Sequence, residues 1–349
     1  MRFAPISCRI SVAGAALALA LSSWAGAGVS AAAPLTAANW DLAQQRQVVR
    51  DGLMADVGSS FQGGASLSAQ QANAALAALA TRLPAAGIAA ATRSPRMARG
   101  AVSMVAFDSM LVEALGLGEV AAHVQGAAAA AGLSPPPYFG SEVVARFLEL
   151  RYEQPIGHEA LDLFPYEPIS RAEAAWSLSR VLGFGEWNVA YARQTLSAFA
   201  LPHMSSNQLA ALRIAVSRIG YPYVWGGTTD DTADGLAHGG FDCSGFVWRV
   251  FKVSGLPWGE RIRGRTAAEQ AGEIPRSARL RAGQLAPGDL LFFGSAHFNS
   301  RATESNVIHE GIYLGDNWVI HSSGQGVYVL PLRGSWLGTS FAWGRRVIG

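Results

Sequence analysis

The residue with the clearest chemical potential in this sequence is Cys243, which follows a glycine-rich stretch and precedes an apolar run at residues 246–253. The run predicts a helix with the cysteine in its first turn, where the helix dipole favours a thiolate and lowers the thiol pKa. Asp242 is positioned to cap this helix through its side-chain oxygen, and Gly245 allows a substrate or another segment to approach closely. These features suit a nucleophile for acyl transfer; a small buried cysteine without chemistry is the alternative.

Two histidines on neighbouring predicted strands supply a candidate base and its orienting partner. Residues 307–314 and 318–322 are typical of strands, and the glycine-containing turn between them indicates a hairpin. In the cysteine form of a catalytic triad, His309 takes or holds the thiol proton and His321 orients the His309 imidazole. The backbone amide of Cys243 is then placed to stabilise the oxyanion.

The length of the hairpin loop decides whether the two imidazoles can meet. A three-residue loop at 315–317 pairs Leu314 with Trp318 and sets His321 opposite Gly311, which clears the space in front of the ring. Both histidines then lie on one face, about 7–8 Å apart along a diagonal between backbones. A two-residue loop would put them on opposite faces, because side chains alternate along a strand.

Further residues near the cysteine are candidates for substrate binding. Tyr223 lies in an aromatic and glycine-rich stretch at residues 221–227, and its hydroxyl is suited to place a substrate or donate a hydrogen bond. Asp242 and Ser244 flank the cysteine and are predicted to contact the substrate as well. His297 is an alternative base, but it does not lie in a predicted strand and has no polar neighbour that would share a strand face with it.

The acidic loop at residues 228–240 raises the question of a metal site. Its candidate ligands are Asp230, Asp231, Asp234 and His238. Their spacing fits no known calcium loop, and a solvated turn is the simpler interpretation. The histidines of the N-terminal half have no partner at metal-ligand spacing. We therefore expect neither a metal nor a cofactor.

The N-terminus has the pattern of a signal peptide. Residues 1–33 contain Arg2 and Arg9, an apolar run at 10–21 and then small residues, in that order. The apolar run is short for a transmembrane helix, although a retained membrane anchor is the alternative. Removal of the segment, together with Cys8, leaves an exported protein with a single thiol where disulfides are the norm. The prediction is a secreted or cell-envelope protein without stable membrane insertion.

Length and composition limit the remaining classes of protein. The 349 residues allow two or three domains, and a chain that is 50% hydrophobic and 15% charged supports a sizeable core. The formal net charge of +2 comes from the two arginines of the signal segment, which contains no acid. The mature chain is therefore near neutral, and nothing indicates nucleic-acid binding.

The sequence between the signal segment and residue 205 is predicted to be helical. Leucine and valine recur at helical spacing in alanine-rich stretches, and prolines mark the boundaries. The expected helices include 98–115, 120–131 and 140–152. The predicted organisation is a signal peptide at 1–33, an alanine-rich helical region at 34–137, a second helical region at 138–205 and a C-terminal domain at 206–349.

Part of the second helical region, about residues 138–184, resembles one S-layer homology repeat. The helix at 140–152 is followed by a Phe-Pro loop, and Ser170 with Glu173 forms a capping box that opens the next helix. Such repeats often attach exported proteins to cell-wall polymers, so the resemblance implies a wall partner for this region. A helical spacer that packs on the catalytic domain, or holds it away from something, is the favoured alternative because only one clear repeat is present.

Six motifs in order resemble the NlpC/P60 family of cell-wall cysteine peptidases over about residues 206–335. They are Pro-Tyr-Val-Trp-Gly-Gly at 222–227, Phe-Asp-Cys-Ser-Gly-Phe-Val at 241–247, the stretch 266–270, Pro-Gly-Asp-Leu at 287–290, His-Glu-Gly-Ile-Tyr-Leu-Gly at 309–315 and Val-Ile-His-Ser at 319–322. The resemblance implies an α+β class with a papain-like domain, in which helices pack on a small antiparallel sheet. By motif position it implies Cys243 as nucleophile, His309 as base, His321 in the third position and Tyr223 in the substrate site.

The function that these observations predict is a secreted, metal-free cysteine endopeptidase. The resemblance implies hydrolysis of peptidoglycan stem peptides, between D-glutamate and the following diamino acid, through a thioester acyl-enzyme. The stretches 228–240 and 294–306 are longer than is usual in the family, and both are expected to flank the cleft and restrict or reshape substrate entry. The alternatives are a transpeptidase, amidase or acyltransferase on the same scaffold, and a wall-binding protein whose catalysis is lost or blocked.

Overall fold

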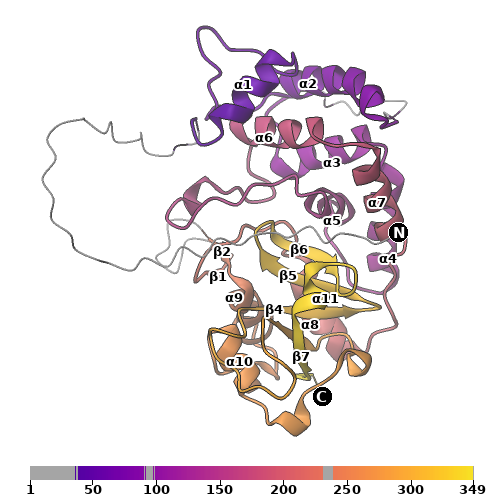
Figure 1. Cartoon of the computed structure of the whole chain (residues 1–349), viewed down its shortest axis with the longest axis vertical. Coiled ribbons are helices and arrows are strands. Elements are labelled where there is room, and N and C mark those ends of the chain that lie inside the picture. The colour runs from indigo at the N-terminus through magenta and orange to yellow at the C-terminus, as the bar shows by residue number, and fades with distance from the viewer. Residues whose placement is uncertain are drawn as a thin grey trace, which may run out of the picture. The chain divides into compact units, whose positions relative to one another are not determined.

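The computed structural model describes most of the chain beyond the predicted signal peptide. The described residues are 36, 38–89, 91, 97, 99–230 and 239–348. The signal peptide predicted at 1–33 lies outside them, as do Asp231, Asp234 and His238 of the acidic loop. From Leu35 onward the chain forms one compact unit. In it a helical region (residues 36–205) leads into a C-terminal region (residues 206–348) that contains the main sheet (Figure 1).

Polar caps divide the alanine-rich part of the helical region into separate helices. The Ser68 side chain accepts a hydrogen bond from the Gln71 amide, and the Gln71 side chain accepts one from the Ser68 amide. This reciprocal capping box fixes the residue at which the second helix begins. The first elements are α1 (Leu42–Arg50), α2 (Ala69–Arg82), the 3-10 helix η1 (Leu83–Ala86), α3 (Met104–Ala114) and α4 (Gly118–Ala130).

The helix predicted at 140–152 is shorter in the structure. It ends as α5 (Phe139–Phe147), because Glu149 takes a positive φ of 56°, a left-handed conformation that an α-helix cannot continue through. Ser170 accepts a hydrogen bond from the Glu173 amide at 3.0 Å, which is the forward half of the predicted capping box. The other elements of this region are η2 (Glu159–Leu161), α6 (Arg171–Leu182) and α7 (Glu186–Leu196).

A five-stranded antiparallel sheet forms the centre of the C-terminal region, with strand order β6-β5-β4-β3-β7. Its strands are β3 (Leu290–Phe293), β4 (His309–Gly315), β5 (Trp318–Ser323), β6 (Gly326–Pro331) and β7 (Phe341–Arg345). Around it lie α8 (Ser206–Val216), the small pair β1 (Thr228–Thr229) and β2 (Gly240–Phe241), α9 (Cys243–Trp248), the π-helical turn η3 (Arg249–Val253), η4 (Gly259–Arg261), α10 (Ala267–Gly272), η5 (Arg276–Ala278), η6 (Ala282–Gln284) and α11 (Trp336–Ser340). Helices followed by a small antiparallel sheet confirm the predicted α+β class.

The hairpin between β4 and β5 has a shorter loop than predicted. Asp316 and Asn317 both have positive φ values, 44° and 79°, and form a two-residue loop. Gly315 pairs with Trp318 across this loop, so the predicted pairing of Leu314 with Trp318 is wrong. Two consecutive left-handed residues suit a hairpin whose turn follows the twist of its strands.

The predicted position of His321 is nevertheless confirmed, because it lies opposite Gly311. The register shifts between Tyr313 and Gly315, which is the signature of a β-bulge that adds one residue to β4. A two-residue loop alone would put His309 and His321 on opposite faces of the sheet, and this extra residue returns them to the same face. The bulge, and not the loop length, keeps both imidazoles on one face.

The two faces of the sheet carry different apolar clusters. One face belongs to the main core and packs under α9, with Phe246, Leu290, Phe292, Ile312 and Ile320 among its members. The other face forms a separate cluster with α11, made of Leu291, Phe293, Val319, Tyr328, Leu330, Leu332 and Leu337. Any residue of β4 therefore points either toward α9 or toward α11.

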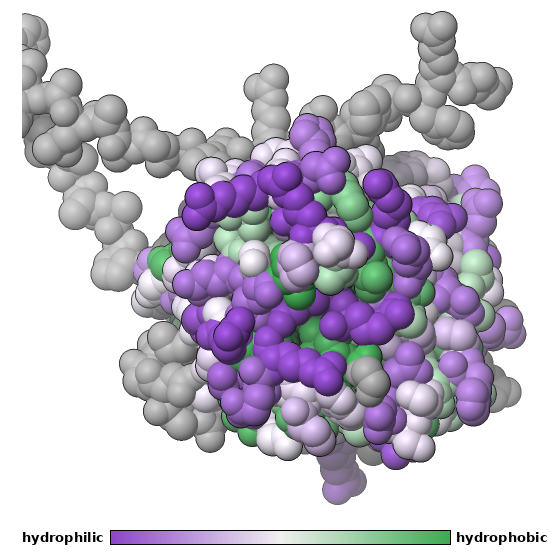
Figure 2. All heavy atoms as spheres, turned by 90° about the horizontal axis from the view of Figure 1, so that it is seen from below, coloured by the Kyte–Doolittle hydropathy of each residue, from purple (hydrophilic) through white to green (hydrophobic). Residues whose placement is uncertain are grey.

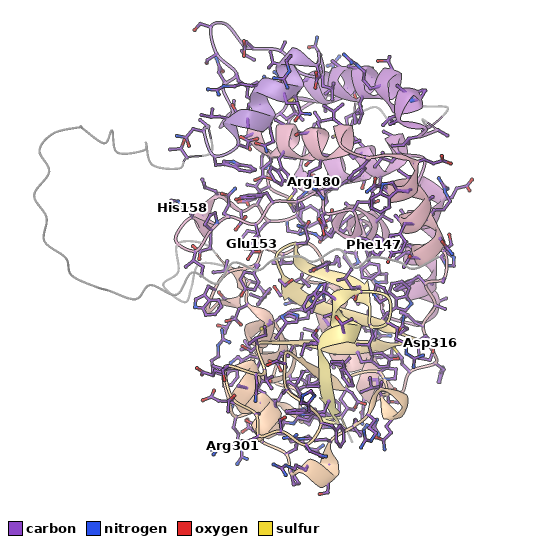
Figure 3. All side chains as sticks on the ribbon, in the orientation of Figure 1. Phe147, Glu153, His158, Arg180, Arg301 and Asp316 are labelled. Atoms are coloured by element: carbon purple, nitrogen blue, oxygen red, sulfur yellow. The ribbon has the colours of Figure 1, made fainter. Side chains whose placement is uncertain are left out.

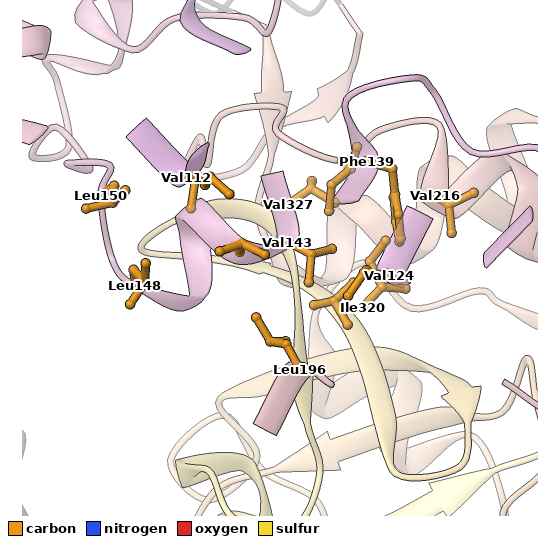
Figure 4. Close-up of a cluster of buried hydrophobic side chains, with 14 of the residues drawn as sticks. Val112, Val124, Phe139, Val143, Leu148, Leu150, Leu196, Val216, Ile320 and Val327 are labelled. Carbon is orange, nitrogen blue, oxygen red and sulfur yellow. The ribbon is translucent and has the colours of Figure 1, made fainter. Parts of the chain in front are cut away.

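The main core runs without interruption from the helical region into the C-terminal region. Figure 4 shows part of it, with labelled side chains Val112, Val124, Phe139, Val143, Leu148, Leu150, Leu196, Val216, Ile320 and Val327. Full burial of a side chain of this kind contributes about 1.5–3 kcal/mol. Because α5 packs on β6, the helical region covers an edge strand of the sheet.

Buried polar contacts also cross between the two regions. Arg146 is buried beside Glu142 with 2.8 Å between Nε and Oε2, and its Nη2 donates to the Gly220 carbonyl at 2.8 Å. The Gln325 side chain accepts a hydrogen bond from the Arg151 amide at 3.1 Å and donates to the Arg151 carbonyl at 2.8 Å. These bonds fix Gly220 and the turn between β5 and β6 against α5 and the segment that follows it.

In the face that Figure 2 shows, hydrophilic side chains predominate and apolar ones appear in smaller areas between them. Within the described ranges, no helix combines the length and the apolar character needed to cross a bilayer. The predicted domain boundaries at residues 137/138 and 205/206 fall inside the compact unit and stay predictions.

Candidate active site

Cys243 is the first residue of α9, and Asp242 is the N-cap of that helix. Asp242 Oδ1 accepts a hydrogen bond from the Gly245 amide at 2.5 Å, which is the predicted cap. A Cβ at Gly245 would lie 1.8 Å from the Gly227 carbonyl oxygen, so only glycine fits there. The cap and this close contact hold the head of α9, with its sulfur, against the stretch 222–227.

The surroundings of the Cys243 sulfur favour the neutral thiol. Burial raises the pKa of Cys243 to about 12, and the carboxyl groups of Glu310 and Asp242 add to the rise. The backbone amides of Glu310 and Ser244 donate toward the sulfur and lower the pKa, but by less. The predicted lowering of the thiol pKa is therefore wrong for this structure, because enclosure and two acidic neighbours outweigh the amides at the helix terminus.

Asp242 and Ser244 are bound to Arg265, a residue that no sequence motif marked. Arg265 Nη1 and Nη2 lie 3.0 Å from the two carboxylate oxygens of Asp242, and Nη1 donates to Ser244 Oγ at 2.8 Å. Asp242 Oδ2 also accepts from the Gly226 amide at 3.0 Å. Since Arg265 and Asp242 are 23 residues apart, local patterns could not reveal the contact. The predicted contact of Asp242 and Ser244 with substrate stays a prediction.

His309 and His321 meet on the face of the sheet that carries α11. His309 Nε2 and His321 Nδ1 are 3.0 Å apart and share a hydrogen bond. His309 is 7% exposed and His321 is fully buried. Burial lowers the pKa of His309 to about 3 and that of His321 well below its usual value, so both rings are neutral near neutral pH.

This hydrogen bond restricts which nitrogen of each ring can carry a proton. For His309 to accept a proton at Nδ1, its own proton must sit on Nε2 and be donated to His321 Nδ1. The proton of His321 then sits on its Nε2, which has no hydrogen-bond partner among the residues that the structure describes. The arrangement suits His309 Nδ1 as the basic site and His321 as the residue that orients it.

Aromatic side chains enclose the two imidazoles. The centroid of the Trp336 ring lies 5.2 Å from that of His309 and 5.8 Å from that of His321. Tyr328 lies 4.3 Å from His321, and Phe293 lies 5.7 Å from His309, again between centroids. The enclosure explains the lowered pKa values of the imidazoles. Trp336 comes from the short helix α11, for which the sequence carried no recognised signal.

The thiol comes from α9, and the two histidines come from β4 and β5, which both pack against α9. The sulfur lies at the amide of Glu310, the residue that follows His309 in β4. Within the described part of the chain, no hydrogen bond joins the sulfur to His309, whose Nε2 is bonded to His321. Proton transfer therefore requires His309 Nδ1 to approach the sulfur, a contact that often tightens only when substrate binds.

Tyr223 lies near the nucleophile, beside a recess between the two regions. Burial raises the pKa of Tyr223, and the neighbouring Cys243 and Asp242 raise it further. The recess has a volume of about 230 Å³ and is lined by Glu153, Gln154, Pro155, Ile156, Glu159, Tyr223 and Trp225. Glu153 is labelled in Figure 3 where the helical region meets the C-terminal region. The helical region thus supplies part of the wall beside the predicted substrate tyrosine.

The other sequence candidates lie apart from this constellation. His297 is an exposed loop residue whose amide donates to Ser300 Oγ at 3.0 Å. Asp230 forms ion pairs with Arg218, at 3.0 Å, and with Arg249, so it ties its loop to α8 and η3. Over the described ranges, no group of three or more histidine, cysteine, aspartate or glutamate side chains is arranged to hold a metal ion.

A helix-borne cysteine packed beside two neighbouring strands, each of which carries one histidine of a hydrogen-bonded pair, is a candidate thiol–imidazole site of the kind used in acyl transfer. Comparison with known proteins places this site in a family. Residues 220–346 match the model of the NlpC/P60 family. The similarity to NlpC/P60 domains is therefore located in the C-terminal region of the chain. The comparisons give no support to the S-layer homology resemblance at residues 138–184.

The chain spans only part of the length of the curated relatives that match, so the similarity is confined to part of each. The probable peptidoglycan endopeptidase LytE of Bacillus subtilis is 33% identical over 122 residues, which cover 35% of this chain and 29% of LytE. The bifunctional muramidase/DL-endopeptidase CwlT of the same organism is 32% identical over 135 residues, covering 38% of this chain and 35% of CwlT. Among solved structures, the NlpC/p60 domain of the peptidoglycan hydrolase SagA has 27% identity and a TM-score of 0.30, and it covers 40% of this chain and 97% of that one.

Proposed function

We propose that the protein is an exported cysteine endopeptidase that hydrolyses peptidoglycan stem peptides, at the bond between D-glutamate and the following diamino acid. The observation that carries the proposal is the hydrogen-bonded pair His309–His321 on the two strands, β4 and β5, that pack beside the helix that begins with Cys243. Relatives named as peptidoglycan endopeptidase and DL-endopeptidase support the substrate class and the bond type.

The proposed reaction passes through a thioester. The Cys243 sulfur attacks the peptide carbonyl carbon while His309 Nδ1 takes the thiol proton, and the amide of Cys243 is placed toward the oxyanion. The C–N bond breaks, and the departing amine takes the proton from His309. Water then attacks the thioester with His309 again as base, which releases the carboxylate and restores the thiol. His321 keeps the His309 ring in the required tautomer throughout.

Neutral thiol and neutral imidazole are the starting pair in this mechanism. Because burial raises the pKa of Cys243 to about 12 and lowers that of His309 to about 3, a preformed thiolate–imidazolium pair is disfavoured in the free protein. Proton transfer is then coupled to attack, as in serine hydrolases. The low reactivity of the resting thiol would protect an exported protein from oxidation before it meets substrate.

The helical region is proposed to position the peptidase domain and to complete its cleft. Its residues Glu153 and Glu159 line the recess beside Tyr223 and Trp225, which supports a role in substrate entry. Attachment of this region to cell-wall polymers, and Tyr223 as a substrate-site residue, are further parts of the same proposal. The proposal also includes export of the protein, with cleavage of the signal peptide within residues 25–33.

Digestion of purified peptidoglycan tests the proposal. Wild-type protein should release peptides whose new ends, identified by mass, are a D-glutamyl carboxylate and a free diamino acid amine, and Cys243→Ala should release none. Adding amine acceptors separates hydrolysis from acyl transfer, because an acyltransferase would yield the acceptor adduct. Binding to sacculi without new ends, in wild type and Cys243→Ala alike, would contradict the proposal and favour a catalytically silent wall-binding protein.

A further inference from the structure

Glu310 is a buried carboxyl group beside the nucleophile that the mechanism above does not use. It follows His309 in β4, so its side chain lies on the opposite face of the sheet, the face under α9. It pairs across the sheet with Phe292, a member of the apolar core. Its side chain is fully buried, and neither carboxyl oxygen has a hydrogen-bond partner among the described residues. Its backbone amide donates toward the Cys243 sulfur.

The cations near Glu310 are already bound to other carboxylates. Arg265 contacts both oxygens of Asp242 at 3.0 Å. Arg345, from β7, places Nη1 2.6 Å from Glu273 Oε2 and donates to the Gln270 carbonyl at 2.9 Å. Each arginine is thus neutralised by its own partner, and neither forms a hydrogen bond with Glu310. A negative charge on Glu310 would have no counter-ion in direct contact.

Two acids therefore lie at the head of α9, the half-buried thiol of Cys243 and the fully buried carboxyl of Glu310, and within the described part of the chain neither has a cation bonded to it. Like charges held close together in a dry site oppose each other's ionisation, so the first proton is lost far more easily than the second. We propose that Glu310 controls the ionisation of Cys243, because the head of α9 accepts a single negative charge that either the carboxylate or the thiolate can carry. The inference rests on the proposed function only for the role of Cys243 as nucleophile.

Catalysis under this scheme needs Glu310 to stay protonated. In the attack step the thiol proton moves from Cys243 Sγ to His309 Nδ1, while the carboxyl proton of Glu310 stays in place. When Glu310 has lost its proton to solvent, its charge opposes the negative charge that forms on sulfur. The charged and titratable groups that act on Glu310 are Asp242, Cys243, Arg265, Glu273 and Arg345. Burial, and then Asp242, raise the pKa of Glu310 well above its usual value, in keeping with a neutral resting carboxyl.

The test measures the thiol directly. The rate of Cys243 alkylation by iodoacetamide is measured at a series of pH values in the full chain. Mass spectrometry of the peptide that contains Cys243 gives the extent of labelling. Glu310→Gln keeps the size of the side chain and removes its charge. The midpoint of the labelling curve should fall by about one pH unit, which is about tenfold faster labelling at a fixed pH below the midpoint. Glu260→Gln, an exposed site in the same region, is the matched control and should leave the curve unchanged.

A second variant separates charge from disturbance of the packing. Glu310→Met fills a similar volume without charge or hydrogen-bonding groups, and it should move the midpoint in the same direction with the same plateau rate at high pH. A higher plateau with an unmoved midpoint would mean that the variants merely expose the sulfur, and it would overturn the proposal. So would curves for both variants that superimpose on wild type. Labelling does not depend on peptide cleavage, so a shifted midpoint in a protein that cuts no peptidoglycan would refute the proposed function and leave this inference standing.

Discussion

The buried ionisable groups of the helical region are arranged quite differently from those of the active site. In the helical region several of them are matched with opposite charges, although Asp162 is buried with no cation bonded to it among the described residues. Arg146 is bonded to Glu142, and Arg151 is paired with Asp108 and lies 3.7 Å from Glu173. All of these side chains are almost completely buried. Each of these charges is balanced by its partner, so the polar side chains can be buried in the core.

At the active site the corresponding groups are neutral or uncompensated. His309 and His321 are bonded to each other, and Cys243 and Glu310 lie together with no cation bonded to either in the described part of the chain. Burial without compensation raises the free energy of the charged forms and shifts each pKa. The difference teaches that the matched pairs of Arg146 and Arg151 stabilise the packing of the helical region, whereas the unmatched groups around Cys243 are candidates for proton transfer.

The largest expected effect comes from removing a member of the unmatched set. Cys243→Ala or His309→Ala should lower the rate of stem-peptide hydrolysis on the order of 10⁴-fold or more, because nucleophile and base act as one unit. The rate of release of new amine ends from purified peptidoglycan measures it. His297→Ala is the matched control and should retain wild-type activity, since His297 is an exposed loop residue. Full activity in His309→Ala would assign the base elsewhere.

The next effect tests the matched set. Arg146→Met leaves the Glu142 carboxylate buried without its partner and should lower the free energy of unfolding by about 3–5 kcal/mol. Urea unfolding at neutral pH measures the change. The double variant Arg146→Met/Glu142→Leu removes both charges and should recover most of the loss. If the single variant is as stable as wild type, the pair does not support the boundary between the regions.

The two histidines give a dependence of stability on pH. Burial lowers the pKa of His309 to about 3 from the ordinary 6.5, so the unfolded chain takes up the proton first as the pH falls. The stability is complete above the unfolded pKa and declines from there toward pH 3, at about 1.4 kcal/mol per pH unit for each such group. His309→Gln removes one of these groups, so the free energy of unfolding should decline less steeply as the pH falls. Urea unfolding at several pH values measures the decline. His297→Gln should leave the slope as it is, and an unchanged slope in His309→Gln would show that the ring is not held neutral.

The smallest effect has the opposite sign and lies in the helical region. Burial and the nearby Glu173 raise the pKa of Asp162 to about 8 from 3.8, so stability is complete at low pH and is lost as the pH rises between these values. Asp162→Asn keeps the acceptor for the Gln154 amide, now 3.2 Å away, and should be more stable than wild type by about 1–3 kcal/mol at pH 7. The advantage should vanish near pH 4. A loss of stability at pH 7 would show that the carboxylate is compensated after all, as its neighbours are.

The features that the sequence predicted well are those that local patterns encode. The cap at Asp242 and the strand that carries His309 follow from residue type and spacing alone. The shared face of His309 and His321 was predicted through a three-residue loop, but the structure reaches it through a two-residue loop and a bulge at Leu314. The shorter loop and the bulge offset each other, so both histidines still lie on one face of the sheet. A bulge depends on how β4 is paired on both edges, which a period-two pattern does not record.

The features that escaped prediction depend on contacts between distant parts of the chain. Arg265 reaches back to Asp242, Trp336 lies over the histidines from a short helix, and Glu310 is buried under α9. The raised pKa of Cys243 has the same origin, because a helix terminus was visible in the sequence but the enclosure around the sulfur was not. Each of these is set by packing that only the folded chain brings about.

The apolar contact between α5 and β6 has a consequence for how the protein can be divided. The family match begins at residue 220, yet Val143 and Phe139 share a core with Val327 and Ile320. A fragment cut out along the boundary of the family match would expose apolar side chains of the edge strand β6, which also carries Tyr328, the neighbour of His321. The helices are thus a co-folding partner of the candidate active site, and transfer of residues 220–346 alone into another protein would need a substitute for them.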